Sequence, residues 1–448
     1  MRALYANGWI VTMDDPGTEH RRGWVLVEDG VILSLGGGAE PEAADDVERI
    51  ELGGAVVTPG LINTHHHLCQ TLTRARAQQA DLFTWLRELY PVWAGLDAEA
   101  EYAAARTGLA ELALSGCSTV FDHHYVFPRG RQGIVEAEVQ AAGELGVRIV
   151  ASRGSMDLGV SDGGLPPDEL VEELDAIVAD TERLHAELHE EGPGARVQIA
   201  VAPCSPFSVT TRLMAEAATL ARRKGVRLHT HLAETDDEDE FCRKRFGCTP
   251  VEYAESVGWL GDDVWLAHGV HLDDSAIERL GATGTGVAHC PSSNARLGAG
   301  MARVRDLLDH AVPVGLGVDG AASQEVSHLG AELRQAMYTA RLRGGPKAMT
   351  AREALRLGTM GGARCLGRED QLGSIEAGKL ADLVVWRLDG PAHDGIDDRL
   401  AALVFGPPAP IELSLVGGRP VVRRGELVHA DGETLQRAAA AAHRRLLT

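Results

Sequence analysis

Long hydrophobic runs, paired cysteines and a basic N-terminal leader are all missing from this 448-residue sequence. No apolar stretch approaches the ~20 residues that cross a bilayer, so the sequence predicts no membrane span. Residues 1–20 lack the basic start and the apolar run of a signal peptide. The seven cysteines include no Cys-x-x-Cys pair and are expected to be free thiols in a reducing compartment. We therefore expect a cytoplasmic protein with no membrane partner.

Basic residues are also scarce, with 43 Lys and Arg against 65 Asp and Glu, which gives a formal net charge of −22. A surface of this sign repels the phosphates of nucleic acids, so we expect no nucleic-acid partner. Solubility alone accounts for the acidic excess. The 44% hydrophobic content of so long a chain is ample for one large core and a satellite domain.

The middle of the chain, residues 58–369, alternates short apolar runs with longer segments of helical periodicity. The candidate strands are 55–62, 118–123, 147–152, 197–203, 226–231, 264–268, 285–289 and 313–318. Helices are expected at 97–115, 168–189 and 211–224. Alternation of this kind, repeated eight times, predicts an α/β fold with a (β/α)₈ TIM-like barrel over residues 58–369.

Both ends of the chain contain short strand-like runs instead. Residues 8–13 and 23–36 are rich in Val, Ile and Leu, and the second run breaks at Asp29-Gly30, a hairpin signal. Residues 381–388 and 413–428 have the same character, and a helical tail follows them. We expect residues 1–57 and 370–448 to form a composite β-sandwich domain beside the barrel. Two separate small β modules are the alternative.

Histidines lie at the ends of two candidate barrel strands. The run TPGLIN leads into His65-His66-His67. Because alternate strand residues point the same way, His65 and His67 can face one metal while His66 faces elsewhere. The run VRL leads into His229 and His231, and we assign the ligand to His231, which is nearer the strand end. His229 is then expected to lie one layer deeper in a structural role.

A carboxylate completes the predicted metal site. Asp319 ends the apolar, glycine-punctuated run VPVGLGV, and a buried Asp needs a partner, for which a metal is the natural choice. Three imidazoles and a carboxylate suit zinc or iron, and zinc is the usual metal of hydrolysis. We therefore predict one divalent metal per chain, Zn²⁺ with Fe²⁺ as the alternative, held by His65, His67, His231 and Asp319.

Two further side chains stand beside these ligands in the sequence. Glu234 follows His231 by three positions, and His268 ends the apolar run VWLA. In the predicted mechanism the metal lowers the pKa of water, Asp319 accepts its proton, and His268 hydrogen-bonds the attacking oxygen. Glu234 carries a proton to a ring nitrogen and then to the departing amine. The predicted catalytic residues are thus Glu234, His268 and Asp319.

The segments PGLINTHHH, HTHLAE, HGVHL and GVDG, with GSIEAGKLADLVVW near the C-terminus, resemble the amidohydrolase superfamily over nearly the whole chain. Two-metal members need a Lys or Glu from the fourth strand, whereas VQIAVAPCS has neither and no Lys precedes Lys224. The resemblance is therefore to the mononuclear branch, which includes cytosine, guanine and adenosine deaminases. A cyclic amidase or dipeptidase is the rival within the fold, and a non-enzymatic metal-binding protein would not need Glu234 or His268.

Other segments resemble the 8-oxoguanine deaminases, among them NTHHHLCQTLTR, GCSTVFDHHYVFPRG and TGVAHCPSSNARL. That resemblance implies hydrolysis of the 2-amino group of 8-oxoguanine to urate and ammonia. It also implies that Gln70, Arg74, Tyr125 and His123 bind the substrate. Gln70 and Arg74 are four residues apart, so one helical turn would place both on one face, unless Arg74 pairs with a surface acid instead.

Some features leave the substrate open. Cys69 and Gln324-Glu325 depart from the pattern of these deaminases. Isocytosine, isoxanthopterin, guanine and hydroxylated s-triazines present the same amino-substituted carbon between ring nitrogens. Trp85 and Trp93 can supply a stacking wall or only pack the loop. A homo-oligomer is allowed by analogy with proteins of this kind.

Overall fold

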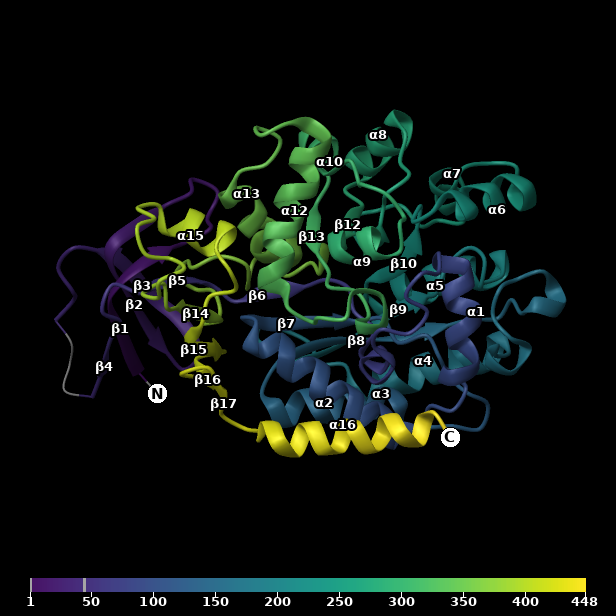
Figure 1. Cartoon of the computed structure of the whole chain (residues 1–448), viewed down its shortest axis with the longest axis horizontal. Coiled ribbons are helices and arrows are strands. Elements are labelled where there is room, and N and C mark those ends of the chain that lie inside the picture. Colours follow the sequence, from purple (N-terminus) through teal and green to yellow (C-terminus); the bar gives the residue numbers. More distant parts are fainter. Residues whose placement is uncertain (1, 43–45) are drawn as a thin grey trace.

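Eight parallel strands close into a barrel in the computed structural model, which describes residues 2–42 and 46–448. The strands are β6 (Leu61–Asn63), β7 (Cys117–Asp122), β8 (Arg148–Ser155), β9 (Val197–Pro203), β10 (Leu228–Leu232), β11 (Val264–His268), β12 (Gly286–His289) and β13 (Val314–Leu316). β13 pairs with β6 and thereby closes the ring. The predicted (β/α)₈ barrel is confirmed (Figure 1).

Helices surround the barrel and fill the connections between its strands. Those of the first half are α1 (Leu82–Trp93), α2 (Ala98–Leu114), α3 (Ile134–Leu145), α4 (Leu174–Leu188) and α5 (Thr211–Lys224), with short 3₁₀ turns η1 (Leu68–Thr73), η2 (Val160–Asp162) and η3 (Asp168–Leu170). Those of the second half are α6 (Asp236–Phe246), α7 (Pro250–Ser256), α8 (Asp274–Thr283), α9 (Pro291–Arg296), α10 (Val304–Asp309), α11 (Ala321–Gln324), α12 (Leu329–Gly344), α13 (Ala351–Arg356), the π-turn η4 (Leu357–Gly361) and α14 (Gly362–Cys365). None of the helices in the described part of the chain combines the length and apolar character that crossing a bilayer requires.

The two chain ends fold together, as expected, into a nine-stranded mixed sheet at the left of Figure 1. Its strands are β1 (Arg2–Val11), β2 (Glu19–Glu28), β3 (Val31–Gly37), β4 (Glu48–Glu51), β5 (Val56–Pro59), β14 (Leu383–Trp386), β15 (Ile411–Val416), β16 (Arg419–Arg423) and β17 (Glu426–Leu427). β5 joins the two halves, since it pairs parallel with β1 and antiparallel with β14. Asp29 and Gly30 both have positive φ, which confirms the predicted hairpin between β2 and β3. The predicted domain limits remain a prediction, and residues 1 and 43–45 of the first range lie outside the described residues.

The predicted single strand 55–62 is wrong in one respect, because the chain changes sheets within it. β5 belongs to the terminal sheet and β6 to the barrel, and Gly60 separates them. The Gly60 amide donates to the carbonyl of Asp382 at 2.8 Å. A Cβ at this position would lie 2.3 Å from Ser118 Oγ, so only glycine allows the sheet and the barrel to approach so closely.

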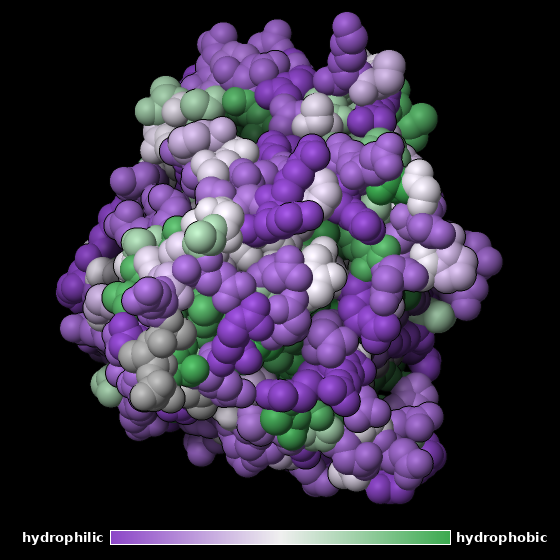
Figure 2. All heavy atoms as spheres, turned by 90° about the vertical axis from the view of Figure 1, so that its left-hand side faces the viewer, coloured by the Kyte–Doolittle hydropathy of each residue, from purple (hydrophilic) through white to green (hydrophobic). Residues whose placement is uncertain are grey.

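Trp386 of β14 and the C-terminal helix attach the terminal segment to the barrel. The Trp386 ring is buried against Gly116, just before barrel strand β7, where a Cβ would lie 2.5 Å from the ring. Its Nε1 donates to Thr58 Oγ1 of the neighbouring strand β5 at 2.9 Å. Helix α16 (Gly432–Leu446) runs along α2 in Figure 1, and α15 (Arg399–Phe405) packs nearer the sheet. His443 Nδ1 of α16 donates to the carbonyl of Leu72 at 2.6 Å, in the segment that follows β6. Viewed from the sheet side, the surface is mainly hydrophilic (Figure 2).

Candidate metal centre and active site

The predicted site residues meet at the carboxyl ends of the barrel strands. His65 and His67 follow β6, His231 lies in β10, His268 ends β11 and Asp319 follows β13. The Nε2 atoms of His67 and His231 are 3.1 Å apart. Asp319 Oδ1 lies 3.4 Å from His65 Nε2 and 3.3 Å from His67 Nε2. Four distant segments therefore converge on one small volume at the face where such barrels build their active sites.

Carbonyl groups fix the tautomers of two of these histidines. His67 Nδ1 lies 2.6 Å from the carbonyl oxygen of His123, and His231 Nδ1 lies 2.7 Å from that of Cys204. A carbonyl can only accept, so both Nδ1 atoms carry the proton. Both Nε2 atoms then present lone pairs to each other at 3.1 Å, which is repulsive unless a cation lies between them.

A hydrogen bond to His229 gives His65 the same tautomer, with the proton on Nδ1. His229 Nδ1 donates to the carbonyl of Trp265 at 2.8 Å, so its Nε2 accepts the proton of His65 Nδ1 at 2.9 Å. The lone pair of His65 Nε2 therefore points into the cluster, and this buried atom has no hydrogen-bond partner. His229 lies behind His65, in the deeper position expected for it. Three converging lone pairs beside a carboxylate are an arrangement that can hold a divalent metal, which makes this cluster the candidate metal site.

The electrostatics of the cluster agree with that interpretation. Burial lowers the pKa of His65 to about 3 and lowers that of His231 well below its usual range, which keeps both imidazoles neutral for ligation. Burial alone would raise the pKa of Asp319, but the His65 and His67 side chains outweigh it and hold the pKa well below its usual value. Asp319 is therefore an ionised carboxylate beside the neutral rings of His65 and His231.

Strained backbone places the side chains at three of the strand ends. Ala233, His268 and Asp319 have φ values of 54°, 73° and 64°, in the left-handed region that residues other than glycine rarely adopt. Such conformations cost on the order of 1–3 kcal/mol each and persist where the surroundings enforce them, often at functional sites. Ser293 Oγ donates to Asp319 Oδ2 at 2.6 Å, and the Gly320 amide donates to Oδ1 at 2.7 Å.

Glu234 and His268 lie beside the metal site as a pair. His268 Nε2 is 3.6 Å from Glu234 Oε2, and His268 Nδ1 is held at 3.0 Å by Asn294 Oδ1. Burial, with repulsion from Asp319 second, raises the pKa of Glu234 well above its usual value, so this carboxyl can deliver a proton. The Glu238 carboxylate accepts the amides of Ala233 and Glu234, both at 2.9 Å, and so fixes this loop.

A narrow cleft opens onto these groups, with about 30 Å³ of free space, enough for one or two water molecules. Its lining consists of His67, Gln70, Leu82, Trp85, Leu86, Tyr125, Cys204, Phe207, His231, Glu234, His268, Leu297, Asp319 and Ser323. Gln70 and Tyr125 are thus brought to the cleft, and the buried Gln70 Oε1 has no hydrogen-bond partner among the described residues. Trp85 forms one wall, whereas Trp93 is buried away from the cleft and donates to Thr73 Oγ1 at 3.2 Å.

Arg74, unlike Gln70, is not among the residues that line the cleft. The η1 turn ends at Thr73 and Arg74 has an extended backbone with ψ of 146°, so Gln70 and Arg74 do not share a helical face. Arg74 instead forms an ion pair with Glu111 at 2.7 Å, as the alternative interpretation allowed. His123 does not line the cleft either. It stacks on His231 with ring centres 4.7 Å apart and donates from Nε2 to the carbonyl of Ala202 at 2.9 Å.

Similarity to known proteins agrees with this geometry. The sequence matches the Amidohydrolase family over residues 56–421. It is 49% identical over 398 residues to an 8-oxoguanine deaminase of Pseudomonas aeruginosa, with 88% of each chain covered. The chain belongs to the amidohydrolase family. It is also 37% identical over 455 residues to the hydroxydechloroatrazine ethylaminohydrolase of Pseudomonas sp. (strain ADP), covering 98% of this chain and 94% of that protein.

A solved structure extends the likeness to three dimensions. The amidohydrolase superposes on the zinc complex of atrazine chlorohydrolase TrzN from Arthrobacter aurescens TC1 with a TM-score of 0.93. The two are 32% identical, and the alignment covers 98% of this chain and 100% of the other. The predicted superfamily and its deaminase branch are confirmed by these matches.

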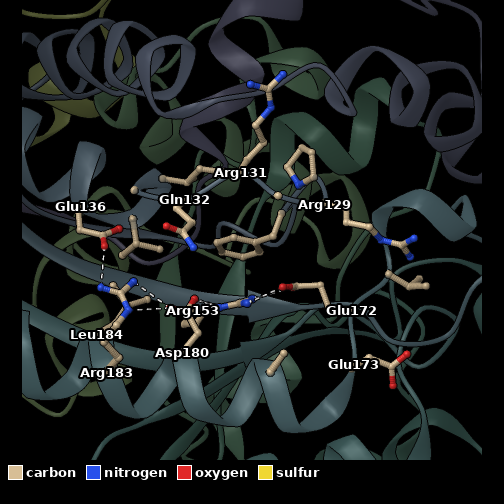
Figure 3. A pocket seen from close by; sticks show the side chains of 18 residues that line it. Arg129, Arg131, Gln132, Glu136, Arg153, Glu172, Glu173, Asp180, Arg183 and Leu184 are labelled. Atoms are coloured by element: carbon tan, nitrogen blue, oxygen red, sulfur yellow. Dashed lines mark hydrogen bonds and ion pairs between the residues drawn. The ribbon is translucent and has the colours of Figure 1, made fainter.

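A much wider groove on the amidohydrolase lies elsewhere, between the loop after β7 and helix α4 (Figure 3). Arg153 there is paired with Glu172 and Asp180, and Arg183 with Glu136, each at 2.8 Å. No member of the metal site lines this groove. The narrow cleft beside the histidine cluster, and not this wider groove, is therefore the candidate active site of the amidohydrolase.

Sequence reasoning missed several residues of the amidohydrolase site. Ser293 and Asn294 hold Asp319 and His268, and Phe207 and Leu297 line the cleft. The segment PSSN after β12 follows directly on a barrel strand end, and that position was the available signal for the first two. Phe207 and Leu297 come from loops and helix ends, where no periodicity marks them.

We expect Ser293→Ala to lower the affinity of the site for Zn²⁺ roughly 10- to 100-fold, because the ligand carboxylate loses the hydroxyl that orients it. Competition titration with a chromophoric zinc chelator measures this change. The neighbouring, half-buried Ser292 provides the matched control as Ser292→Ala. Equal affinities for wild type and Ser293→Ala would show that this hydrogen bond does not organise the site.

Proposed function

We propose that this amidohydrolase is a zinc-dependent hydrolytic deaminase that converts 8-oxoguanine and water to urate and ammonia. The observation that carries the proposal is that three imidazole lone pairs converge beside the Asp319 carboxylate, with Glu234 next to this cluster. Such a site can activate water and protonate a leaving amine, which are the two requirements of hydrolytic deamination. The 49% identity to an 8-oxoguanine deaminase supports the choice of substrate.

One zinc ion in the active site of each chain is the proposed catalytic cofactor, with iron as the alternative. His65, His67, His231 and Asp319 would hold it, and β9 offers no Lys or Glu to bridge a second ion there. When bound, a divalent metal supplies Lewis acidity that makes water a stronger acid and nucleophile near neutral pH.

The protein's own groups then handle the protons. Asp319, ionised and held by Ser293, is placed to orient the attacking water and accept its proton. Glu234 is placed to donate a proton to the ring nitrogen beside the amino-bearing carbon and afterwards to the departing amine. A C–O bond forms and a C–N bond breaks at the same carbon. His268 is held by Asn294 with Nε2 toward Glu234, where it can hydrogen-bond the attacking oxygen.

Recognition of the heterocycle is assigned to Gln70 and Tyr125. The unpartnered Gln70 amide offers a donor and an acceptor, which suits the edge of a purine with alternating N–H and C=O groups. Trp85 supplies a flat wall for a planar ring. Because the free space is only about 30 Å³, the wall formed by α1 must move outward to admit a bicyclic substrate.

The departures from the 8-oxoguanine deaminase pattern do not touch this cleft. Cys69 is buried but is not part of the lining, and neither is Gln324 or Glu325. Glu325 pairs instead with Arg296 at 3.2 Å. These substitutions therefore do not count against the proposed substrate. Isocytosine, isoxanthopterin, guanine and a hydroxylated s-triazine are the competing substrates for the test.

The zinc-loaded protein is expected to have its highest kcat/KM with 8-oxoguanine in a steady-state comparison with guanine, isocytosine, isoxanthopterin and a hydroxylated s-triazine. Coupled detection of ammonia measures all five on one scale, and chromatography identifies urate as the second product. A higher kcat/KM for any other compound would reassign the substrate. Ammonia release from none of them, with a cyclic amide hydrolysed instead, would reassign the reaction.

Replacing the proposed acid by an isosteric amide isolates its role. We expect Glu234→Gln to retain the metal content of wild type but to lose roughly 10²- to 10⁴-fold in kcat, because the amide cannot donate the proton. Metal analysis and steady-state kinetics on the same preparation separate the two effects. Glu240→Gln, on the exposed face of α6, is the control. Parental turnover in Glu234→Gln would remove this residue from the mechanism.

Gln70 provides a test of recognition distinct from chemistry. Gln70→Leu leaves the hydrogen-bonding edge of the substrate unpaired in a buried cleft, at a cost of about 1–3 kcal/mol, or roughly 5- to 150-fold in kcat/KM. Kinetics with 8-oxoguanine check this, with the exposed Gln79→Leu as control. An unchanged kcat/KM would mean that the substrate edge lies elsewhere.

A further inference from the structure

A second group of ionisable side chains lies beside the segment that follows β6 and contains His65 and His67. It comprises Glu101 of α2, Asp122 at the end of β7, His124 just beyond it, and Glu138 of α3. All four side chains are completely buried, at 0% exposure. Their potential ligand atoms form two sets that share His124. The atoms of Asp122, His124 and Glu138 lie within 4.8 Å of one another, and so do those of Cys69, Glu101 and His124.

The tautomer of His124 is fixed in the same way as those of the active-site histidines. Its Nε2 lies 2.7 Å from the carbonyl oxygen of Val126, so the proton is on Nε2. The Nδ1 lone pair then faces two carboxylates, 3.0 Å from Glu138 Oε1 and 3.6 Å from Glu101 Oε2. Neither contact has the geometry of a hydrogen bond, and His124 Nδ1 has no partner. A lone pair facing carboxylate oxygens at these distances is repulsive unless something positive lies between them.

No basic side chain supplies that positive charge. In the part of the chain that the structure describes, no Lys or Arg forms an ion pair with Glu101, Asp122 or Glu138. Both oxygens of each glutamate and Oδ2 of Asp122 are buried without a hydrogen-bond partner. Isolated buried carboxylates are very costly, and burial raises the pKa of all three groups well above the usual range. The cluster therefore holds extra protons or a cation.

We propose that this cluster binds a second divalent metal ion, of the Zn²⁺ or Mn²⁺ class, through His124 Nδ1 and the carboxylates of Glu101, Asp122 and Glu138. An imidazole whose other nitrogen is anchored on a carbonyl, among several carboxylates, is the donor set that such ions take. A cation beside His124 Nδ1 would partner this lone pair together with oxygens of the surrounding carboxylates. Protons shared among His124, Glu138 and Asp122 are the alternative, and the metal analysis below distinguishes the two.

The ion has a structural role in this position. Asp122 uses its other oxygen, Oδ1, to accept the amide of Leu68 at 2.7 Å, directly after His67. The site thus connects α2, α3 and β7 to the segment that carries two residues of the active-site cluster. Because the ligands are completely buried, the ion is acquired as the chain folds and exchanges slowly afterwards. This inference does not depend on which heterocycle the enzyme uses.

Metal analysis of the full-length protein, expressed with added Zn²⁺ or Mn²⁺, tests the proposal. Wild type is expected to contain two equivalents per chain. His231→Asn should lose only the active-site equivalent, and Glu101→Gln and His124→Asn only the buried one. Glu99→Gln, on the exposed first turn of the same helix, should retain both.

One equivalent in wild type would overturn the proposal and leave shared protons as the explanation. Two equivalents that survive both Glu101→Gln and His124→Asn would overturn it as well. If those variants do not fold, anomalous diffraction from wild-type crystals decides, with a peak expected about 2.0–2.2 Å from His124 Nδ1. A peak at the active-site cluster with none beside His124 would equally exclude the second ion.

Discussion

Repulsion among buried imidazole lone pairs is the constraint on which the site depends. His67 and His231 point their Nε2 lone pairs at each other because carbonyl oxygens take both of their protons, and His229 imposes the same state on His65. This arrangement is costly in the apoprotein and favourable around a cation, so much of the surrounding structure serves to hold it. The left-handed backbone at Asp319 and the hydroxyl of Ser293 both direct one carboxylate toward the same point.

The barrel strands and the clustering of His65, His67, His231 and Asp319 were predictable because each carries a local signal. An apolar run that ends in histidine or aspartate places that side chain at the catalytic face of a barrel, whatever the details of packing. The division between β5 and β6 carried no such signal. Residues 55–62 form one apolar run, and only the close approach of Gly60 to Ser118 shows that the chain leaves one sheet for another. The pattern of apolar residues shows that a segment is buried, but it does not show against which sheet or barrel the segment packs.

Residues of the cleft wall were harder to predict for a related reason. The i, i+4 spacing of Gln70 and Arg74 is meaningful only if a helix continues through both, and η1 ends at Thr73. Gln70 therefore faces the cleft while Arg74 pairs with Glu111. Trp85 and Trp93 lie on the same helix, yet only Trp85 reaches the cleft. Sequence spacing could not distinguish these pairs, because the direction of α1 is set by its packing against the barrel.

Rigidity and mobility are divided between the two sides of the cleft. One side is the barrel rim, where strained strand ends, fixed tautomers and the buried cluster around His124 resist any displacement of the reacting groups. The other side is formed by Leu82, Trp85 and Leu86 of α1, which contributes no metal ligand and lies in the connection between β6 and α2. A cleft with room for one or two waters must widen to admit a planar ring, and the α1 side can move without disturbing the proposed metal ligands. Substrate selection in this enzyme is therefore expected to reside mainly in α1 and the η1 turn, where closure over the ring can exclude water from the reaction.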